Sequence, residues 1–447
     1  MKNSAVVSKP PATGLKGHLV SRARGYILSV LEKGIKHGQL QIVEGNDVRV
    51  FGETKLDHTQ TPGIIYVDDP AVWLRIIMTN DLGFAEAFML GEVRVNDLKA
   101  ICDIWLTNVT HLAGLSTVLH QLFSKVFQFT SNFFGQNLGR ARLNAVAGYD
   151  ASNTMFQAFL SKEMMYSCAL WSDKQGGVNG DLKEKYVDDG FDLEAAQKAK
   201  IDYVLDKLHI KAGDRVLEVG SGWCGLAIQA VTRFGCTIDT LTLSAEQKKL
   251  GEARIKAAGL GNSITVHLLD YRCLPPSFEK AFDAFVSIEM IEHVGTRHYE
   301  KYFQVVDWAL KEKRGMAVVT SSTIAESRYS TYQEPDFSRY YMWPNGALPS
   351  ATALVQAANG GSQGRLILET VENHGKHYPR TLREWKRRFE SNMPAVQQEI
   401  IDEKPELADP ALFEPFKRKW LYLFPYAEAG FDCGYLSCHM LTFGRDV

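Results

Sequence analysis

A glycine-rich turn contains the residues of this chain that point most directly to chemistry. Gly220, Gly222 and Gly225 follow an apolar, β-branched run that ends at Val219, and a helical pattern begins directly after them. Glycine permits positive φ and lets backbone N–H groups approach a ligand closely. Open α/β sheets bind their ligands at the carboxyl ends of the strands. The turn therefore predicts a site for a nucleoside-like cofactor.

Two cofactors fit this turn. The Gly-x-Gly-x-x-Gly spacing also matches a dinucleotide fold. An NAD site, however, ends its second strand with an acidic residue that binds the ribose. Here the second strand pattern ends in Thr242 and Ser244, and Glu218 lies within the end of the first strand. These residues favour S-adenosylmethionine, with NAD or an ordinary strand-to-helix turn as the alternatives.

Composition sets the class of protein. With 447 residues and 45% hydrophobic content, the chain is long enough for two domains with sizeable cores. A formal net charge of -2 argues against general affinity for nucleic acid. The seven cysteines are scattered without Cys-x-x-Cys spacing, so neither a disulfide framework nor a metal site is expected and a reducing compartment fits best. We find no signal-peptide pattern and no apolar run of about 18 residues, so no membrane span is expected.

The first part of the chain predicts a smaller α+β domain over residues 1–145. Short strand patterns alternate with amphipathic helices there. Residues 111–147 carry dense apolar positions at helical spacing, with basic neighbours. The helix that they predict either joins the domains through a core face or also touches lipid. The strands are expected at 40–43, 46–52 and 63–67, the helices at 19–35 and 70–76, and the basic neighbours are Lys125, Arg140 and Arg142.

The second part predicts a doubly wound parallel sheet over residues 146–447. Strand and helix patterns alternate at the spacing of right-handed crossovers. Segments 326–356 and 382–430 read as helical or irregular and suit a lid over the carboxyl edge of the sheet. Strands are expected at 215–219, 237–243, 264–269, 281–288, 315–320, 365–371 and 435–443, and helices at 193–208, 245–258 and 299–310.

Several motifs in this second part carry a family resemblance. Residues 149 to about 447 resemble the cyclopropane fatty acid synthase and mycolic acid cyclopropane synthase family. The stretch 81–93 is similar to the extra N-terminal domain of bacterial and plant members, and 328–350 looks closer to plant-type members. The motifs are Tyr149-Asp150-x-x-Asn153, Met165-Tyr166-Ser167-Cys168, Val216 to Gly225, Leu241-Thr242-Leu243-Ser244-x-x-Gln247, Ser287-Ile288-x-x-x-Glu292-His293-Val294-Gly295 and Tyr378-x-x-Thr381-Leu382-x-x-Trp385.

The resemblance implies a class I methyltransferase fold with a seven-stranded sheet and a specific reaction. The family transfers the methyl group of S-adenosylmethionine to a lipid alkene, and the resulting carbocation loses a proton as a cyclopropane ring closes. The base is understood to be a bound bicarbonate ion. Carried over by motif, its ligands are Cys168, Glu292, Tyr378 and the backbone around Ile324. The alternatives are a buried structural cysteine, a capping or paired glutamate and an ordinary tyrosine.

One residue departs from the family pattern. Bacterial members have a histidine two residues before Ile324, where this chain has Ser322. Serine donates a hydrogen bond but cannot become cationic. The departure puts bicarbonate binding or ring closure in doubt, and the alternative product is a methyl- or methylene-branched chain.

The resemblance also implies the cofactor residues. It assigns Tyr166 and Ser167 to the methionine end, and Gly220 and Gly222 to close backbone approach. The ribose, adenine and pocket positions are Thr242, Leu243 and Gln247, then Asp270 and Tyr271, then Ile288. For Asp270 the alternative is a helix or turn cap.

The expected substrate is an unsaturated phospholipid in a membrane. A cytoplasmic, peripherally attached enzyme is therefore predicted, and a homodimer is compatible with the sequence. A run of basic residues either lies against anionic headgroups or forms a solvated helix face. Two other functions compete with this one: methylation of a soluble small molecule, and lipid binding without catalysis. The basic run comprises Lys376, Arg380, Arg383, Lys386, Arg387 and Arg388.

Overall fold

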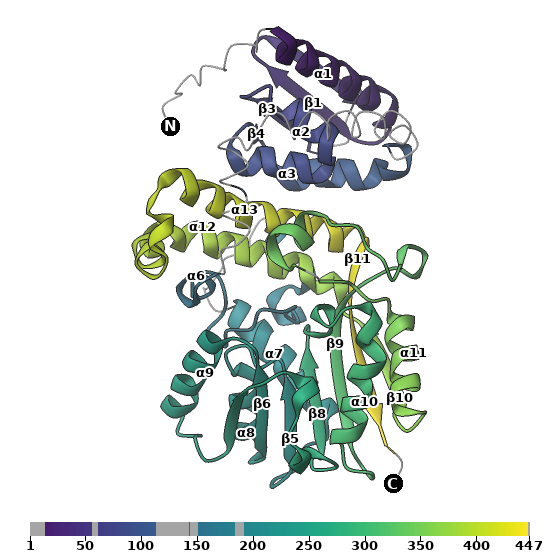
Figure 1. Cartoon of the computed structure of the whole chain (residues 1–447), viewed down its shortest axis with the longest axis vertical. Coiled ribbons are helices and arrows are strands. Elements are labelled where there is room, and N and C mark those ends of the chain that lie inside the picture. Colours follow the sequence, from purple (N-terminus) through teal and green to yellow (C-terminus); the bar gives the residue numbers. More distant parts are fainter. Residues whose placement is uncertain are drawn as a thin grey trace. The chain divides into compact units, whose positions relative to one another are not determined.

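The computed structural model describes residues 14–55, 61–112, 143, 151–183, 192–344 and 346–445. The chain forms two compact units (Figure 1). Unit 1 comprises Met1–Asp150, Pro335–Pro344 and Ile401–Cys433, and unit 2 comprises Ala151–Glu334, Asn345–Ile400 and Gly434–Val447. The two later segments of unit 1 fall within the range that the sequence assigned to the catalytic domain. The predicted boundary near residue 145 lies outside the described residues and stays a prediction.

Unit 2 contains the predicted seven-stranded sheet. The strand order is β10-β11-β9-β8-β5-β6-β7. Strands β5 to β9 pair in parallel, and β11 runs antiparallel to β9 and β10. Because β5 pairs with both β6 and β8, the chain reverses its winding at β5, where such sheets bind ligands. The strands are β5 (Arg215–Val219), β6 (Thr237–Thr242), β7 (Ile264–Leu268), β8 (Ala284–Ile288), β9 (Met316–Ile324), β10 (Ile367–Asn373) and β11 (Leu436–Gly444).

Helices cover both faces of this sheet, as the alternating strand pattern requires. Successive side chains of a strand point to opposite faces. Val216 joins a core with α7 and α8, whereas its neighbour Leu217 joins a second core with α10 and α11. The helices of unit 2 are α6 (Asn153–Gln157), α7 (Asp192–Lys207), α8 (Gly225–Phe234), α9 (Ala245–Ala257), α10 (Tyr299–Ala309), α11 (Ala351–Ser362) and most of α12 (Tyr378–Glu403).

Unit 1 is the predicted smaller α+β unit. Its four strands have the order β2-β1-β3-β4. Helix α13 packs on α3, and Arg418 Nη1 donates to the Phe88 carbonyl at 2.9 Å. The elements are α1 (Gly14–Gly34), β1 (Gln39–Glu44), β2 (Asp47–Gly52), β3 (Gly63–Val67), α2 (Val72–Thr79), α3 (Asp81–Leu90), β4 (Val93–Val95) and α13 (Pro410–Asp432).

Two predictions bear on membranes. The helix expected over 111–147 lies almost wholly outside the described residues, so its joining or lipid-facing role stays a prediction. Among the helices that the structure describes, none combines the length and hydrophobicity needed to cross a bilayer.

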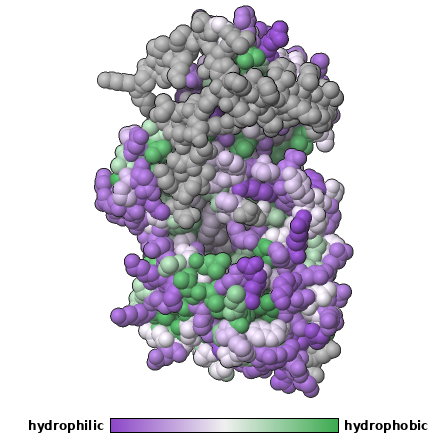
Figure 2. Space-filling model, in the orientation of Figure 1, coloured by the Kyte–Doolittle hydropathy of each residue, from purple (hydrophilic) through white to green (hydrophobic). Residues whose placement is uncertain are grey.

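On unit 2, hydrophobic side chains gather in the area of β6 on the face seen in Figure 2.

Candidate active site

The turn after β5 has the backbone that its glycines predicted. Gly220 and Gly222 have φ of 98° and 48°, where L side chains are strained. A Cβ on Gly220 would lie 3.1 Å from Met290 Cβ, whereas one on Gly222 would meet open space. The hydroxyl of Ser221 between them is buried without a hydrogen-bond partner. An unpaired buried hydroxyl in an open glycine turn fits a polar ligand such as S-adenosylmethionine.

The end of β6 adds further residues next to this turn. Thr242 Oγ1 donates to Gln247 Oε1 at 2.8 Å, and Ser244 caps α9 by accepting from the Gln247 N–H at 3.2 Å. Between them Leu243 is 74% exposed. The structure therefore brings these predicted residues together, and their role at the ribose of the cofactor stays a prediction. Ile288 lies at the end of β8, on the other side of β5.

Asp270 has the capping role that was the alternative reading. Its carboxylate accepts from the Arg272 N–H and pairs with the Arg272 guanidinium at 2.9 and 2.7 Å. The hydrogen bond from Arg272 lowers the pKa of Asp270. The ring of Tyr271 packs on Tyr302 at 5.4 Å between centroids. An adenine contact for Asp270 and Tyr271 stays a prediction.

The motif at residues 166–168 connects an aromatic cluster to a polar cavity. The Tyr166 ring lies 5.1 Å from Phe156 and 5.3 Å from Trp385 between centroids. Ser167 is buried, and its Oγ accepts a hydrogen bond from Lys200 Nζ. Burial lowers the pKa of the Lys200 ammonium.

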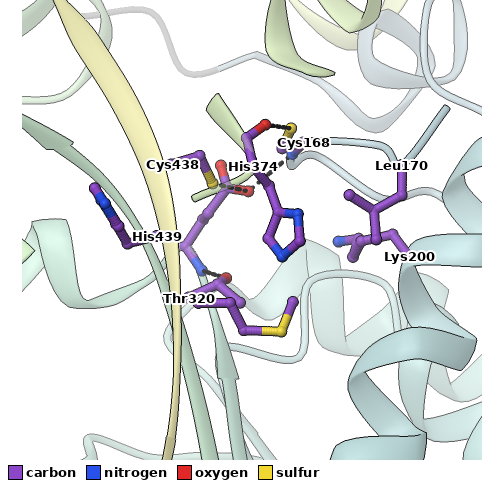
Figure 3. A pocket seen from close by; sticks show the side chains of 9 residues that line it. Cys168, Leu170, Lys200, Thr320, His374, Cys438 and His439 are labelled. Atoms are coloured by element: carbon purple, nitrogen blue, oxygen red, sulfur yellow. Dashed lines mark hydrogen bonds between the residues drawn. The ribbon is translucent and has the colours of Figure 1, made fainter. Parts of the chain in front are cut away.

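Glu289 contributes a buried carboxylate to the lining of a cavity, and Figure 3 shows side chains that line it. Glu289 Oε1 accepts from the Cys168 backbone N–H at 2.8 Å, and Glu289 Oε2 accepts from the Tyr378 hydroxyl at 2.6 Å. The thiol of Cys438 lies 3.8 Å from Oε1. Burial raises the pKa of Glu289. The cavity is lined by Cys168, Leu170, Lys200, Glu289, Thr320, His374, Cys438, His439 and Met440.

Sequence reasoning missed the charged residues of this cavity. Among the predicted site residues, Cys168 lines it and Tyr378 reaches it through Glu289. Lys200 had a readable signal, because it lies at helical spacing with the buried Leu193, Ala196 and Val204 of α7. A lysine on an apolar stripe is rarely buried without a partner.

The second predicted carboxylate is also buried. Glu292 Oε1 accepts from the Ser322 backbone N–H at 2.6 Å, and Glu292 Oε2 is buried without a partner. Burial, with a contribution from Glu289, raises the pKa of Glu292 to about 8. The structure thus brings Glu292 and Ser322 together through the serine backbone. The Ile324 N–H donates to the Pro349 carbonyl at 3.0 Å.

The predicted bicarbonate does not fit this arrangement. Its expected donors on Cys168 and Tyr378 both bind the carboxylate of Glu289. Its expected backbone donor at Ile324 binds a carbonyl, and the one at Ser322 binds Glu292. The protein itself therefore occupies the hydrogen-bonding positions that would hold bicarbonate.

One member of the predicted basic run, Arg380, lies inside the fold, and a headgroup role for the other members stays a prediction. Arg380 is fully buried, and its Nη1 donates to the carbonyls of Gln175 and Gly177 at 2.7 and 2.6 Å. Its guanidinium also lies 4.1 Å from the Trp171 ring centroid. Arg383, Arg387 and Arg388 form ion pairs with Asp181, Glu384 and Glu194. Both readings of the run, as a lipid-facing or a solvated face, are therefore wrong for Arg380, since the charge is used inside the fold.

Solved structures define the class of fold. The mycolic acid cyclopropane synthase CmaA1 complexed with SAH and CTAB is similar with a TM-score of 0.53 and 25% identity, over 68% of this chain and 98% of that chain. A coclaurine N-methyltransferase bound to N-methylheliamine and SAH gives a TM-score of 0.60 at 16% identity, over 80% and 98%. The fold of unit 2 is that of the S-adenosylmethionine-dependent methyltransferases.

Sequence relatives define the family. A family model for mycolic acid cyclopropane synthetase matches residues 136–440. The tuberculostearic acid methyltransferase UfaA1 of Mycobacterium tuberculosis is 30% identical over 96% of this chain and 93% of its own length. The cyclopropane-fatty-acyl-phospholipid synthase of Escherichia coli is 30% identical over 86% and 89%. The chain therefore belongs to the mycolic acid cyclopropane synthetase family, whose members are S-adenosylmethionine-dependent enzymes that modify lipids.

Proposed function

We propose that this protein transfers a methylene group from S-adenosylmethionine to the double bond of an unsaturated phospholipid acyl chain and forms a cyclopropane ring. The observation that carries the proposal is the juxtaposition of two sites. The glycine turn follows β5, the carboxylate cavity receives Glu289 from the end of the adjacent β8, and the two strands pair in parallel. A methyl donor and a proton acceptor can thus serve one substrate at the same sheet edge.

The chemistry requires an electrophile and a base. When bound, S-adenosylmethionine supplies a methyl group on a positively charged sulfur. The π electrons of the alkene form the new C–C bond while the C–S electron pair stays on sulfur, which leaves a cation on the adjacent carbon of the acyl chain. Loss of a proton from the new methyl group releases the C–H electron pair to close the ring.

The residues of unit 2 have roles in this sequence. The aromatic faces around Tyr166 and Trp385 stabilise a nearby cation by about 0.5 to 2 kcal/mol each. The backbone of Gly220 and Gly222 lets the cofactor approach closely. The buried hydroxyl of Ser221, which has no hydrogen-bond partner within the protein, forms a hydrogen bond with the cofactor. Leu170 and Met440 add apolar side chains to the lining of the cavity.

A branched product is the second candidate. Ser322 replaces the histidine of bacterial members, and one relative over nearly the whole chain is named for tuberculostearic acid methylation. A hydride shift before proton loss would give a methylene-branched chain from the same cation, and a later reduction would give a methyl branch. Methylation of a soluble small molecule is less well supported, because the curated relatives named above carry lipid names.

Labelled S-adenosylmethionine tests the proposal. The protein is incubated with vesicles of unsaturated phosphatidylethanolamine or phosphatidylglycerol, and the acyl chains are analysed by mass spectrometry. We expect a mass gain of one CH₂ per modified chain, with ring and methylene isomers separated by their fragmentation. Vesicles of saturated phospholipid are the control. Absence of label from unsaturated lipid, with label on an added soluble acceptor, would contradict the proposal.

Access to acyl chains requires contact with a membrane surface. We propose peripheral attachment on the cytoplasmic side, without a contribution from Arg380. Sedimentation with phospholipid vesicles at low and high ionic strength tests the attachment, and a homodimer stays a prediction for light scattering.

A further inference from the structure

Glu289 is held in a conformation that glutamate rarely adopts. It directly follows β8 and has a φ of 46°, which is the left-handed region. Its backbone N–H donates to the Thr320 carbonyl at 3.0 Å and to Thr320 Oγ1 at 3.1 Å. A non-glycine residue in this region costs about 1 to 3 kcal/mol and persists where the surrounding structure compels it.

The carboxylate of Glu289 is bound by two of the hydrogen-bond donors that were expected to hold bicarbonate. Two donors from distant parts of the chain, the Cys168 N–H and the Tyr378 hydroxyl, bind its two oxygens at 2.8 and 2.6 Å. A carboxylate and a bicarbonate ion both present two oxygens on one planar carbon. The cavity therefore already contains, as a side chain, the chemical group that the family resemblance predicts as a separate ion.

Buried titratable groups lie near Glu289. Lys200 lines the same cavity, and its ammonium favours the charged form of Glu289. Glu292 is the second buried carboxylate, with one oxygen on the Ser322 N–H. The imidazole of His374 points toward Leu170 and Lys200 (Figure 3), and burial lowers the pKa of His374, which favours its neutral form. Burial raises the pKa of both carboxylates, and the positive charge of Lys200 acts in the opposite direction on Glu289.

We propose that Glu289 is the built-in base of the reaction and that turnover requires no bicarbonate. This inference rests on the proposed function. One Glu289 oxygen accepts the proton from the newly transferred methyl group, the C–H electron pair closes the ring or forms the methylene double bond, and the carboxylate becomes a carboxylic acid. The Cys168 N–H and the Tyr378 hydroxyl position the carboxylate and stabilise its charge before the step.

The wild-type protein alone provides the first test. Methyl transfer to unsaturated phospholipid vesicles is measured in buffer freed of carbon dioxide, with and without added sodium bicarbonate as the probe. We expect the two rates to agree within about twofold. A fall of tenfold or more on removal of bicarbonate would overturn the inference while leaving the proposed function intact. Absence of lipid labelling under both conditions would instead overturn the proposed function.

Two variants of Glu289 give the second test. Glu289→Gly removes the carboxylate, relieves the positive φ and exposes the two donors to a small anion. We expect its rate to fall by about 100-fold or more, as for loss of a general base, and bicarbonate to restore at least tenfold. Glu289→Gln is expected to lower the rate by a similar factor. Added bicarbonate should not restore it, because the glutamine amide still fills the position that bicarbonate would take.

Controls separate a base from a structural carboxylate. Glu312→Gln removes an exposed glutamate between α10 and β9 and is expected to leave the rate unchanged. Binding of S-adenosylhomocysteine, measured by calorimetry, reports whether each Glu289 variant is folded. Full activity of Glu289→Gly without bicarbonate, or failure of bicarbonate to restore a Glu289→Gly protein that binds S-adenosylhomocysteine, would overturn the assignment.

Discussion

Replacement of Arg380 by methionine tests whether the basic run on α12 serves folding. The guanidinium is fully buried, donates to the carbonyls of Gln175 and Gly177, and pairs with Asp192 at 3.1 Å. Methionine fills much of the volume but leaves two carbonyls and a carboxylate without their donor. Removing one partner of a buried ion pair costs about 3 to 5 kcal/mol, because the other charge stays buried and uncompensated. We expect unit 2 to lose stability by that amount.

The assay should report on unit 2 by itself. A chain with two compact units need not unfold in a single transition, so hydrogen exchange of peptides from α7 and α12 is the better readout. A loss of 3 to 5 kcal/mol corresponds to exchange faster by about 100-fold to several thousandfold. The control is Arg233→Met, since Arg233 pairs with Asp206 at the surface and such pairs contribute about 0 to 1 kcal/mol. Equal effects of the two variants would refute the reasoning.

Three further predictions concern the site. Because burial raises the pKa of Glu292 to about 8, above its value in the unfolded chain, the stability that its protonated form contributes is complete below about pH 4.5 and is lost as the pH rises through 8. The wild type should therefore lose more stability than Glu292→Gln between pH 5 and 9 in thermal unfolding, and identical pH slopes would contradict this. Gly220→Ala places a Cβ against Met290 at a φ of 98°, so it should weaken binding of S-adenosylhomocysteine by tenfold or more in calorimetry. The control is Gly213→Ala, which has a similar φ of 86° but meets open space and should not weaken binding. Lys200→Met removes the ammonium that favours ionised Glu289, so the acid limb of the kcat/KM profile should move to higher pH, and an unmoved limb would count against that coupling.

The sequence determined the fold class well, for a physical reason. Short apolar strands alternating with helices leave few arrangements other than a doubly wound sheet, and the observed strands lie within a few residues of the expected ones. The turn at Gly220 and Gly222 was equally readable, because its backbone requires glycine. The pairing of Thr242 with Gln247 follows from their spacing across a helix N-terminus. Such features depend on short segments of chain.

The segments assigned to each compact unit depended on long-range packing. Residues 401–433 follow the catalytic motifs in sequence, yet α13 packs on α3 in unit 1. No local pattern reports that choice, because an amphipathic helix shows which face is apolar and not which partner covers it. The same holds for the basic run on α12, where a charged composition could not reveal that Arg380 is enclosed by Gln175, Gly177 and Asp192.

The sequence by itself determined that this protein has a doubly wound sheet with a glycine turn after its first strand, since glycine spacing and the alternation of apolar strands with helices are local properties of the chain. Only the tertiary structure decided which carboxylate receives the two donors of the cavity. Cys168, Glu289 and Tyr378 are separated by 121 and 89 residues along the chain, and they meet because the segments that carry them converge at one sheet edge. A hydrogen bond between such distant residues leaves no mark on the spacing of either one.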